Sequence, residues 1–79
     1  MPQIPLTEMK PGQSGTITAI AGGQGLRARL QPLGIRPGKK ITKLSSVFHQ
    51  GPVTISVDNY QIAIGYGKAI RILVEVKEK

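Results

Sequence analysis

The sequence predicts a small, mainly β barrel of five strands, with one short α-helix between the first and second strands. Short runs rich in Val, Ile and Thr recur between residues that favour turns, and only one segment has apolar residues at helical spacing. The 79 residues are expected to form a single domain. Bending so short a sheet into a barrel would hide its edges.

Residues 1–14 predict a tether and a turn rather than regular structure. Three prolines in this stretch interrupt helices, and KPGQSG has turn composition. The first strand is expected over residues 15–21, which are rich in β-branched side chains. Ile17 and Ile20 are three residues apart and would face opposite sides of a flat strand. We therefore expect a strong twist or a bulge there.

The helical segment is predicted within residues 21–35. Leu26, Leu30 and Leu33 fall at i, i+4 and i+7, on one face of a helix, and are expected to plug the core. Pro32 would clash with the carbonyl four residues earlier if the helix were long at that point. We therefore expect a short helix that loosens in its final turn.

Gly34 is predicted to end the helix in the left-handed conformation, as a glycine just past the last apolar position commonly does. Ile35 can then fold back onto the leucine face. Arg36, Pro37 and Gly38 predict a further turn, with proline at its first corner and glycine at its second. The chain would thus pass from helix to strand within a few residues.

The remaining sequence predicts β structure. A long, bent second strand is expected over residues 39–48. A hairpin over residues 51–65 would turn at Asp58 and Asn59, because both residue types tolerate positive φ. GYGKA is expected to be a short turn before the last strand, residues 70–76. The side chains expected on one side of that strand are those of Ile70, Ile72, Val74 and Val76.

The charge of the chain is strongly one-sided. Eleven Lys and Arg residues against four Asp and Glu give a net charge of +7, with a pI of about 10.3. No acidic residue lies between Met9 and Val57. This balance favours an acidic partner, such as nucleic acid, an anionic membrane or an acidic protein surface. It equally fits a solvated basic face that keeps a small protein soluble.

The residue content gives no support for catalysis or metal binding. The chain has no cysteine and a single histidine, His49, whereas a structural metal site needs about four ligands. The acids are scattered and no acidic partner orients His49, so we expect no enzyme. GGQG, residues 22–25, precedes the helix but lacks the G-x-x-x-x-G-K-[ST] pattern of a phosphate loop. It is interpreted as a connector, and no cofactor or metal is expected.

No segment predicts export or membrane insertion. The N-terminus lacks a basic region followed by an apolar run, and no stretch approaches the roughly 20 apolar residues of a membrane span. We expect a soluble, cytoplasmic protein. The sequence leaves open whether it forms a homo-oligomer.

Four stretches follow one another over nearly the whole chain: MKPGQSGTI, GGQGLRARLQPLGIRPGKKI, GPVTISV and KAIRILV. In order and spacing they resemble the FeoA family, small SH3-like barrels associated with ferrous iron uptake in bacteria and archaea. The most specific piece is L-x-x-L-G-I-x-P-G, which begins at Leu30, and the next is the GPV tract at residues 51–53. Pro32 departs from the pattern, since that position usually holds a helix former.

The resemblance implies an SH3-like fold and an accessory function. Members of the family are understood to act with FeoB, a membrane-embedded iron permease with a cytoplasmic nucleotide-hydrolysing domain. The same domain type is fused to some metal-dependent transcriptional repressors. The resemblance therefore implies a non-enzymatic cytoplasmic protein that binds the cytoplasmic part of the FeoB permease and supports its assembly or activity.

A cationic corner at the helix and the start of the second strand is the candidate docking surface. Charges at the rim of such a surface mainly raise the association rate. A small barrel that binds single-stranded nucleic acid is the alternative, although such barrels usually stack bases on aromatic side chains and only three are present. The expected partner-binding residues are Arg27, Arg29, Ile35, Arg36, Lys39, Lys40 and Lys43.

Overall fold

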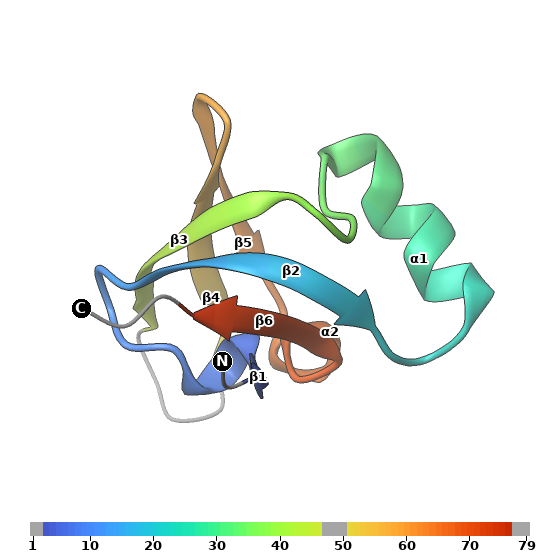
Figure 1. The fold of residues 1–79 in the computed structure, drawn as a ribbon, viewed down its shortest axis with the longest axis horizontal. Coiled ribbons are helices and arrows are strands. Elements are labelled where there is room, and N and C mark those ends of the chain that lie inside the picture. Colours follow the sequence, from blue (N-terminus) through green and yellow to red (C-terminus); the bar gives the residue numbers. More distant parts are fainter. Residues whose placement is uncertain (1–2, 47–50, 77–79) are drawn as a thin grey trace.

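A computed structural model describes residues 3–46 and 51–76. These residues form one strongly curved antiparallel sheet of six strands in the order β1-β6-β2-β3-β4-β5, with helix α1 beside one end of it (Figure 1). The main elements are β1 (Gln3–Pro5), β2 (Ser14–Ile20), α1 (Gln24–Leu30), β3 (Lys40–Ser46), β4 (Val53–Val57), β5 (Tyr60–Ile64), α2 (Tyr66–Ala69) and β6 (Ile72–Val76). Short 3-10 turns follow β1 and α1.

Residues 3–9 belong to the fold, so the prediction of a tether is wrong for them, and residues 1 and 2 lie outside the described part of the chain. β1 pairs with β6, with Gln3 opposite Glu75, and adds a sixth strand to the five predicted. Leu6 and Met9, just after it, are only 0% and 2% exposed. The prolines exclude a long helix here, but Pro5 is compatible with a strand at the edge of a sheet, where one side of the backbone needs no partner.

A bulge in β2 resolves the irregular spacing of its isoleucines. The pairing of β2 with β6 shifts its register between Ile17 and Ala19. The extra residue turns the strand, so that Ile17 and Ile20 both reach the core, at 1% and 4% exposed. The bulge predicted from the sequence is confirmed.

The middle of the chain follows its predicted course. β3 shifts its register against β4 between Lys43 and Ser45, which confirms the expected bend. β4 and β5 form the predicted hairpin, and Asp58 in its turn has a φ of 54°. The last two residues of the predicted second strand, 47 and 48, lie outside the described residues.

Helix α1 is short and loosens as expected. It ends at Leu30 and continues as a 3-10 turn that contains Pro32. Gly34 then adopts a left-handed φ of 83°. Its N–H donates to the carbonyl of Gln31 at 2.9 Å, and the N–H of Ile35 donates to the carbonyl of Leu30 at 3.2 Å. Together these two bonds make a Schellman motif, so the predicted left-handed stop is confirmed.

The leucine plug is only partly as predicted. Leu30 is 3% exposed, and Leu26 packs partly buried against the core. Leu33 is 40% exposed, whereas Ile35 is 0% exposed. The tighter winding of the 3-10 turn takes Leu33 off the face that the other two leucines share. Ile35, folded back by the Schellman motif, fills the core in its place.

The C-terminal third differs from the prediction at one apolar side chain. The expected short turn is the one-turn helix α2, and β6 begins only at Ile72. Ile70 lies between these two elements and is 41% exposed, so it does not share the buried face. The other three residues predicted for that face, Ile72, Val74 and Val76, are buried.

Candidate functional site

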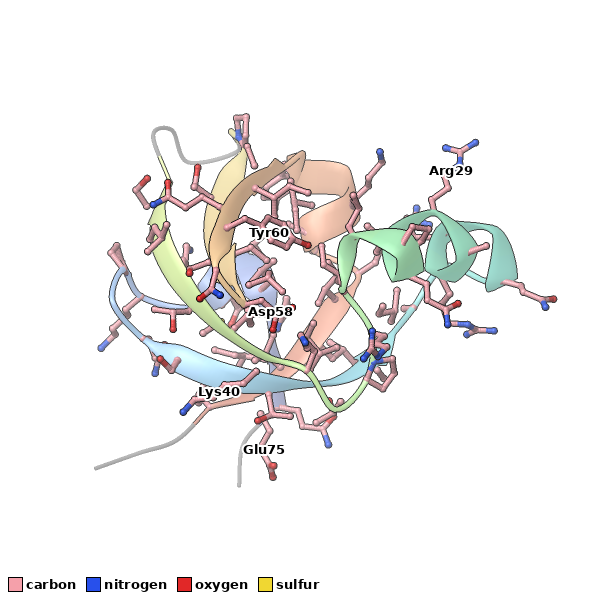
Figure 2. All side chains as sticks on the ribbon, turned by 90° about the horizontal axis from the view of Figure 1, so that it is seen from above. Arg29, Lys40, Asp58, Tyr60 and Glu75 are labelled. Carbon is pink, nitrogen blue, oxygen red and sulfur yellow. The ribbon has the colours of Figure 1, made fainter. Side chains whose placement is uncertain are left out.

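The structure does not bring the seven predicted partner-binding residues together. Arg27, Arg29, Arg36 and Lys40 are exposed. In Figure 2, however, Arg29 points away from α1 and from the barrel, whereas Lys40 projects from the opposite side of the view. The predicted cationic corner is therefore divided between separate surfaces.

Lys43 is buried, and its assignment to the surface is wrong. Its side chain is 2% exposed, and its Nζ donates to the carbonyls of Thr7 at 3.1 Å and Met9 at 2.6 Å. Burial lowers the pKa of Lys43 below its ordinary value of 10.5, because desolvation disfavours the charged form. A sequence signal was present, since Lys43 lies two residues after the buried Ile41 and thus on the same face of β3.

Two further predicted residues are not available as expected. Ile35, predicted at the apolar centre of the surface, is 0% exposed and belongs to the core. Lys39 is half-buried, and its Nζ lies 2.7 Å from Oδ1 of Asp58 in the β4–β5 turn. This ion pair offsets the charge of Lys39 and joins the start of β3 to the hairpin.

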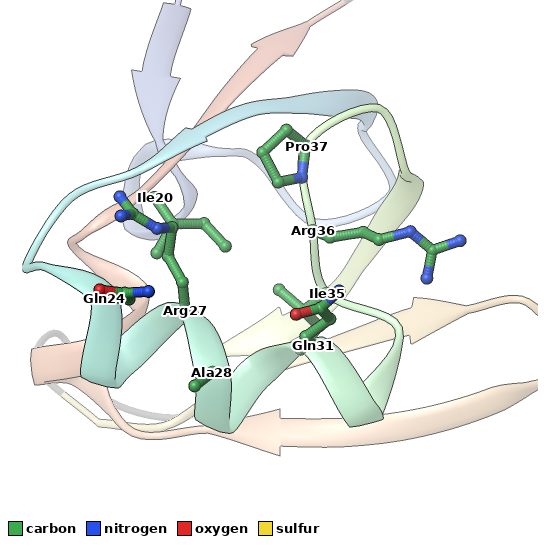
Figure 3. Close-up of a pocket in the computed structure, with 8 residues that line it drawn as sticks. All are labelled: Ile20, Gln24, Arg27, Ala28, Gln31, Ile35, Arg36 and Pro37. Atoms are coloured by element: carbon green, nitrogen blue, oxygen red, sulfur yellow. The ribbon is translucent and has the colours of Figure 1, made fainter.

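A pocket of about 380 Å³ lies between α1 and the turn that follows it (Figure 3). The helical side of the pocket is one stripe of residues at i, i+3, i+4 and i+7. These residues are Gln24, Arg27, Ala28 and Gln31. The other walls are apolar except for Arg36, and are made by Ile20, Ile35 and Pro37.

The turn at residues 36–38 is held firmly against β2. The N–H of Lys39 donates to the carbonyl of Arg36 at 3.1 Å, and Gly38 has a φ of 93°, so the predicted turn is confirmed. The N–H of Gly38 donates to the carbonyl of Ile17 at 2.7 Å. The wall that carries Arg36 and Pro37 is therefore fixed relative to the sheet.

The charges at the pocket are all positive. Arg27 and Arg36 are its charged lining residues among those that the structure describes, and no acid in that part of the chain lines it. Figure 3 shows Arg27 reaching from α1 toward Ile20, while Arg36 leaves the facing wall and extends away from the pocket. Within residues 3–46 and 51–76 the one ion pair is Lys39–Asp58, so neither guanidinium is paired with a carboxylate there.

The chemistry of this pocket suits the binding of an anion. Among the described residues, its lining offers the guanidinium of Arg27, two amides and aliphatic surface, with Arg36 at its rim. Guanidinium groups hold anions, because they are positively charged and carry five N–H donors. The sequence analysis identified Arg27 and Arg36 but missed Gln24 and Gln31, because it considered only the leucine face of the helix and the basic residues. The polar stripe at the same helical spacing was the available signal.

Within the described residues no three His, Cys, Asp or Glu side chains group as metal ligands. His49 lies outside that part of the chain. No helix in the described part is long and apolar enough to cross a membrane.

The chain is similar to proteins of ferrous iron transport over nearly its whole length. The model of the FeoA domain matches residues 4–76. The chain is 38% identical over 74 residues to the Methanocaldococcus jannaschii protein named "Putative Fe(2+) transport protein A". The aligned region covers 94% of this chain and 88% of that protein.

Solved structures agree with this match. The crystal structure of an iron uptake regulatory protein (FeoA) has 39% sequence identity and a TM-score of 0.87, covering 98% of this chain and 100% of that one. A manganese-dependent transcriptional repressor, at 19% identity, shows the fold alone, with a TM-score of 0.87 over 98% of this chain and 38% of the repressor. The motif order, the SH3-like fold and these matches all agree, and the chain therefore belongs to the FeoA family.

Proposed function

We propose that this chain is a non-enzymatic accessory protein of ferrous iron uptake that docks on the cytoplasmic part of an FeoB-type permease. The observation that carries the iron-uptake assignment is the 38% identity, over 94% of the chain, to a relative whose name describes Fe²⁺ transport. Membership of the FeoA family supports the same assignment. The charge of the chain and the pocket beside α1 support the docking.

The charge distribution supports an acidic partner surface. The chain carries a net charge of +7, and α1 contains two arginines and no acid. A cationic face of this kind steers an acidic surface toward itself and raises the association rate, more strongly at low salt. The fixed turn at residues 36–38 would let the two sides of the pocket meet a partner without rearrangement.

Two double variants with the same change in charge test where the partner docks. Arg27→Glu/Arg36→Glu alters the pocket, and Arg29→Glu/Lys40→Glu alters exposed cations outside it. We expect the pocket variant to weaken capture of the purified cytosolic part of the permease at least tenfold. The control variant should change it less than threefold. Binding would be read by interferometry at about 0.15 M salt.

Two outcomes of this experiment, and one of a parallel measurement with a single-stranded oligonucleotide, contradict parts of the proposal. No binding of the wild-type chain would overturn docking on the permease. Equal weakening by both variants would reduce the interaction to overall charge. Affinity for a single-stranded oligonucleotide that persists at about 0.15 M salt, with none for the permease, would favour the nucleic-acid alternative, because nonspecific phosphate binding falls steeply with salt.

A further inference from the structure

We propose that the pocket beside α1 binds an acidic segment of the protein partner in which a leucine-sized side chain neighbours an Asp or Glu. This inference rests on the proposed docking function and names the feature of the partner that the site would recognise. It follows from three properties of the pocket: a preformed apolar wall, a guanidinium above it, and two flanking amides.

The apolar wall is held in place by the core. Ile20 and Ile35 lie beneath the pocket at only 4% and 0% exposed, so packing fixes both side chains and they support the pocket rather than contact a ligand. The apolar lining residues that are exposed are Ala28 and Pro37. Pro37 belongs to the hydrogen-bonded turn. A volume of about 380 Å³ lies in the range of ligand pockets and can accept one or two aliphatic side chains. Because this wall is preformed, little ordering would be lost on binding.

Arg27 gives the pocket its preference for an anion. It reaches from α1 across the pocket toward Ile20 (Figure 3), so a carboxylate beside the bound apolar side chain would lie within its reach. Guanidinium and carboxylate form paired, charge-assisted hydrogen bonds. Gln24 and Gln31 lie one turn to either side of Arg27, and their amides can bond the backbone of an extended peptide.

The pocket fits a peptide better than a nucleic acid or a second copy of this chain. A single strand would need a line of cations with aromatic platforms, but no aromatic residue of segments 3–46 and 51–76 lines the pocket and Arg29 points elsewhere (Figure 2). A second copy brings its own charge of +7 and repels the first. Among its described acids, Asp58 is already paired with Lys39.

The test uses the full chain labelled with ¹⁵N and three synthetic pentapeptides. The probe is acetyl-Gly-Leu-Glu-Leu-Gly-amide, one control replaces its Glu with Gln, and the other replaces both Leu with Ala. We expect the probe to shift the backbone amides of α1 and residues 35–38 in a saturable way. Each control should bind at least fivefold more weakly, because it lacks either the carboxylate or the apolar side chains.

Single variants of the chain separate the pocket from general charge. Ala28→Trp fills the pocket without changing the charge, and Ala28 is exposed, so the core is left intact. Arg27→Gln removes the proposed carboxylate partner. Arg29→Gln removes the same charge roughly 200° away around the helix. The first two variants should weaken probe binding at least fivefold, and the third less than twofold. Unchanged spectra of β3 to β6 would confirm folding.

The inference is overturned if the Gln control binds as tightly as the probe. Shifts that spread over all exposed cations and respond equally to Arg29→Gln would also overturn it. Permease binding separates it from the proposed function. If Ala28→Trp binds the cytosolic permease as well as wild type does, the proposed docking is supported, but the pocket beside α1 is not where the partner binds. If the probe enters the pocket but the permease never binds, the proposed function alone fails.

Discussion

Gly34 joins the helix to the rest of the fold through its own backbone conformation. Its φ of 83° is left-handed, and a Cβ at this position would lie 3.3 Å from the hydroxyl of Tyr60. A β-branched side chain would meet both the backbone strain and this contact. We expect Gly34→Val to lower the free energy of unfolding by about 1–3 kcal/mol, measured by urea denaturation.

Gly25 offers the matched control for that substitution. It lies within α1, and a Cβ there would meet no atom within 4 Å. Gly25→Ala should raise the free energy of unfolding by about 0.5–1 kcal/mol, because alanine loses less backbone entropy in a helix. If Gly34→Val unfolds at the wild-type urea concentration, the left-handed helix stop does not have the importance assigned to it here.

Lys43 is a buried lysine whose ammonium group forms hydrogen bonds with backbone carbonyls. Its ammonium group bonds the carbonyls of Thr7 and Met9, and thus ties β3 to the segment that follows β1. Its own backbone continues this connection, since its N–H donates to the carbonyl of Gln13 and its carbonyl accepts from the N–H of Gly12. Lys43 therefore holds the N-terminal segment rather than a partner.

The lowered pKa of Lys43 predicts how stability depends on pH. Between that lowered value and 10.5, the unfolded chain holds more protons than the folded one, so the free energy of unfolding rises with pH. Lys43→Met lacks this titration. We expect wild-type stability to increase relative to Lys43→Met as pH approaches 10.5 from below, followed by urea denaturation at several pH values. A constant difference would show that burial does not disfavour the charged form.

At the scale of elements, α1 presents two opposite faces with different tasks. Leu26 and Leu30 attach it to the core, while the stripe of Gln24, Arg27 and Gln31 lines the pocket. Its attachment is narrow, because Leu30 is the only fully buried side chain of the helix. A helix held in this way can present its polar stripe to a partner while one leucine carries most of its packing.

Leu30 and Leu33 should differ strongly as a consequence. Leu30→Ala removes a side chain that is 3% exposed, and we expect it to cost about 2–5 kcal/mol. Leu33→Ala removes one that is 40% exposed, and should cost less than about 1 kcal/mol. Thermal and urea unfolding of the two variants would check this. Equal losses of unfolding free energy in the two variants would favour the original prediction, in which all three leucines pack in the core.

The sequence predicted the turns and the helix end correctly, because these features depend on residues that are close together in the chain. The helix stop at Gly34, the turn at Pro37 and the hairpin at Asp58 each depend on residue types that suit special backbone conformations. The burial of Leu6 and the exposure of Leu33 could not be predicted in the same way. The first depends on β1 joining β6, nearly the whole chain away, and the second on a 3-10 turn that alters the helical period.

The candidate site was predictable only in part, for a similar reason. The run of basic residues in the sequence pointed to Arg27 and Arg36. Charge alone, however, cannot show which basic side chains lie on the same surface. Lys40 and Arg29 separate because a strand and a helix carry them in different directions (Figure 2). Ile35 faces inward because the Schellman motif folds it back onto the helix, and Lys43 because the alternation of β3 places it on the face of Ile41. A count of charges contains neither signal.

At the scale of the whole molecule, unbalanced charge should oppose folding. The net charge of +7 makes the compact state repel itself, and raising salt from about 0.01 to about 0.1 M shortens the Debye length from about 30 to about 10 Å. We expect the thermal midpoint to rise over this range. Lys68→Gln, which removes an exposed cation of α2, should rise less steeply. A midpoint that falls with salt would contradict this account.

The pairing of β1 with β6 has a consequence for longer polypeptides. Gln3 lies opposite Glu75, so the first and last strands enter and leave the sheet side by side. A host protein could carry this barrel as an insertion with both junctions close together, and a short linker between the two strands would permit circular permutation. The antiparallel pairing of β1 with β6 thus allows the domain to be inserted into a longer chain while its pocket beside α1 stays accessible.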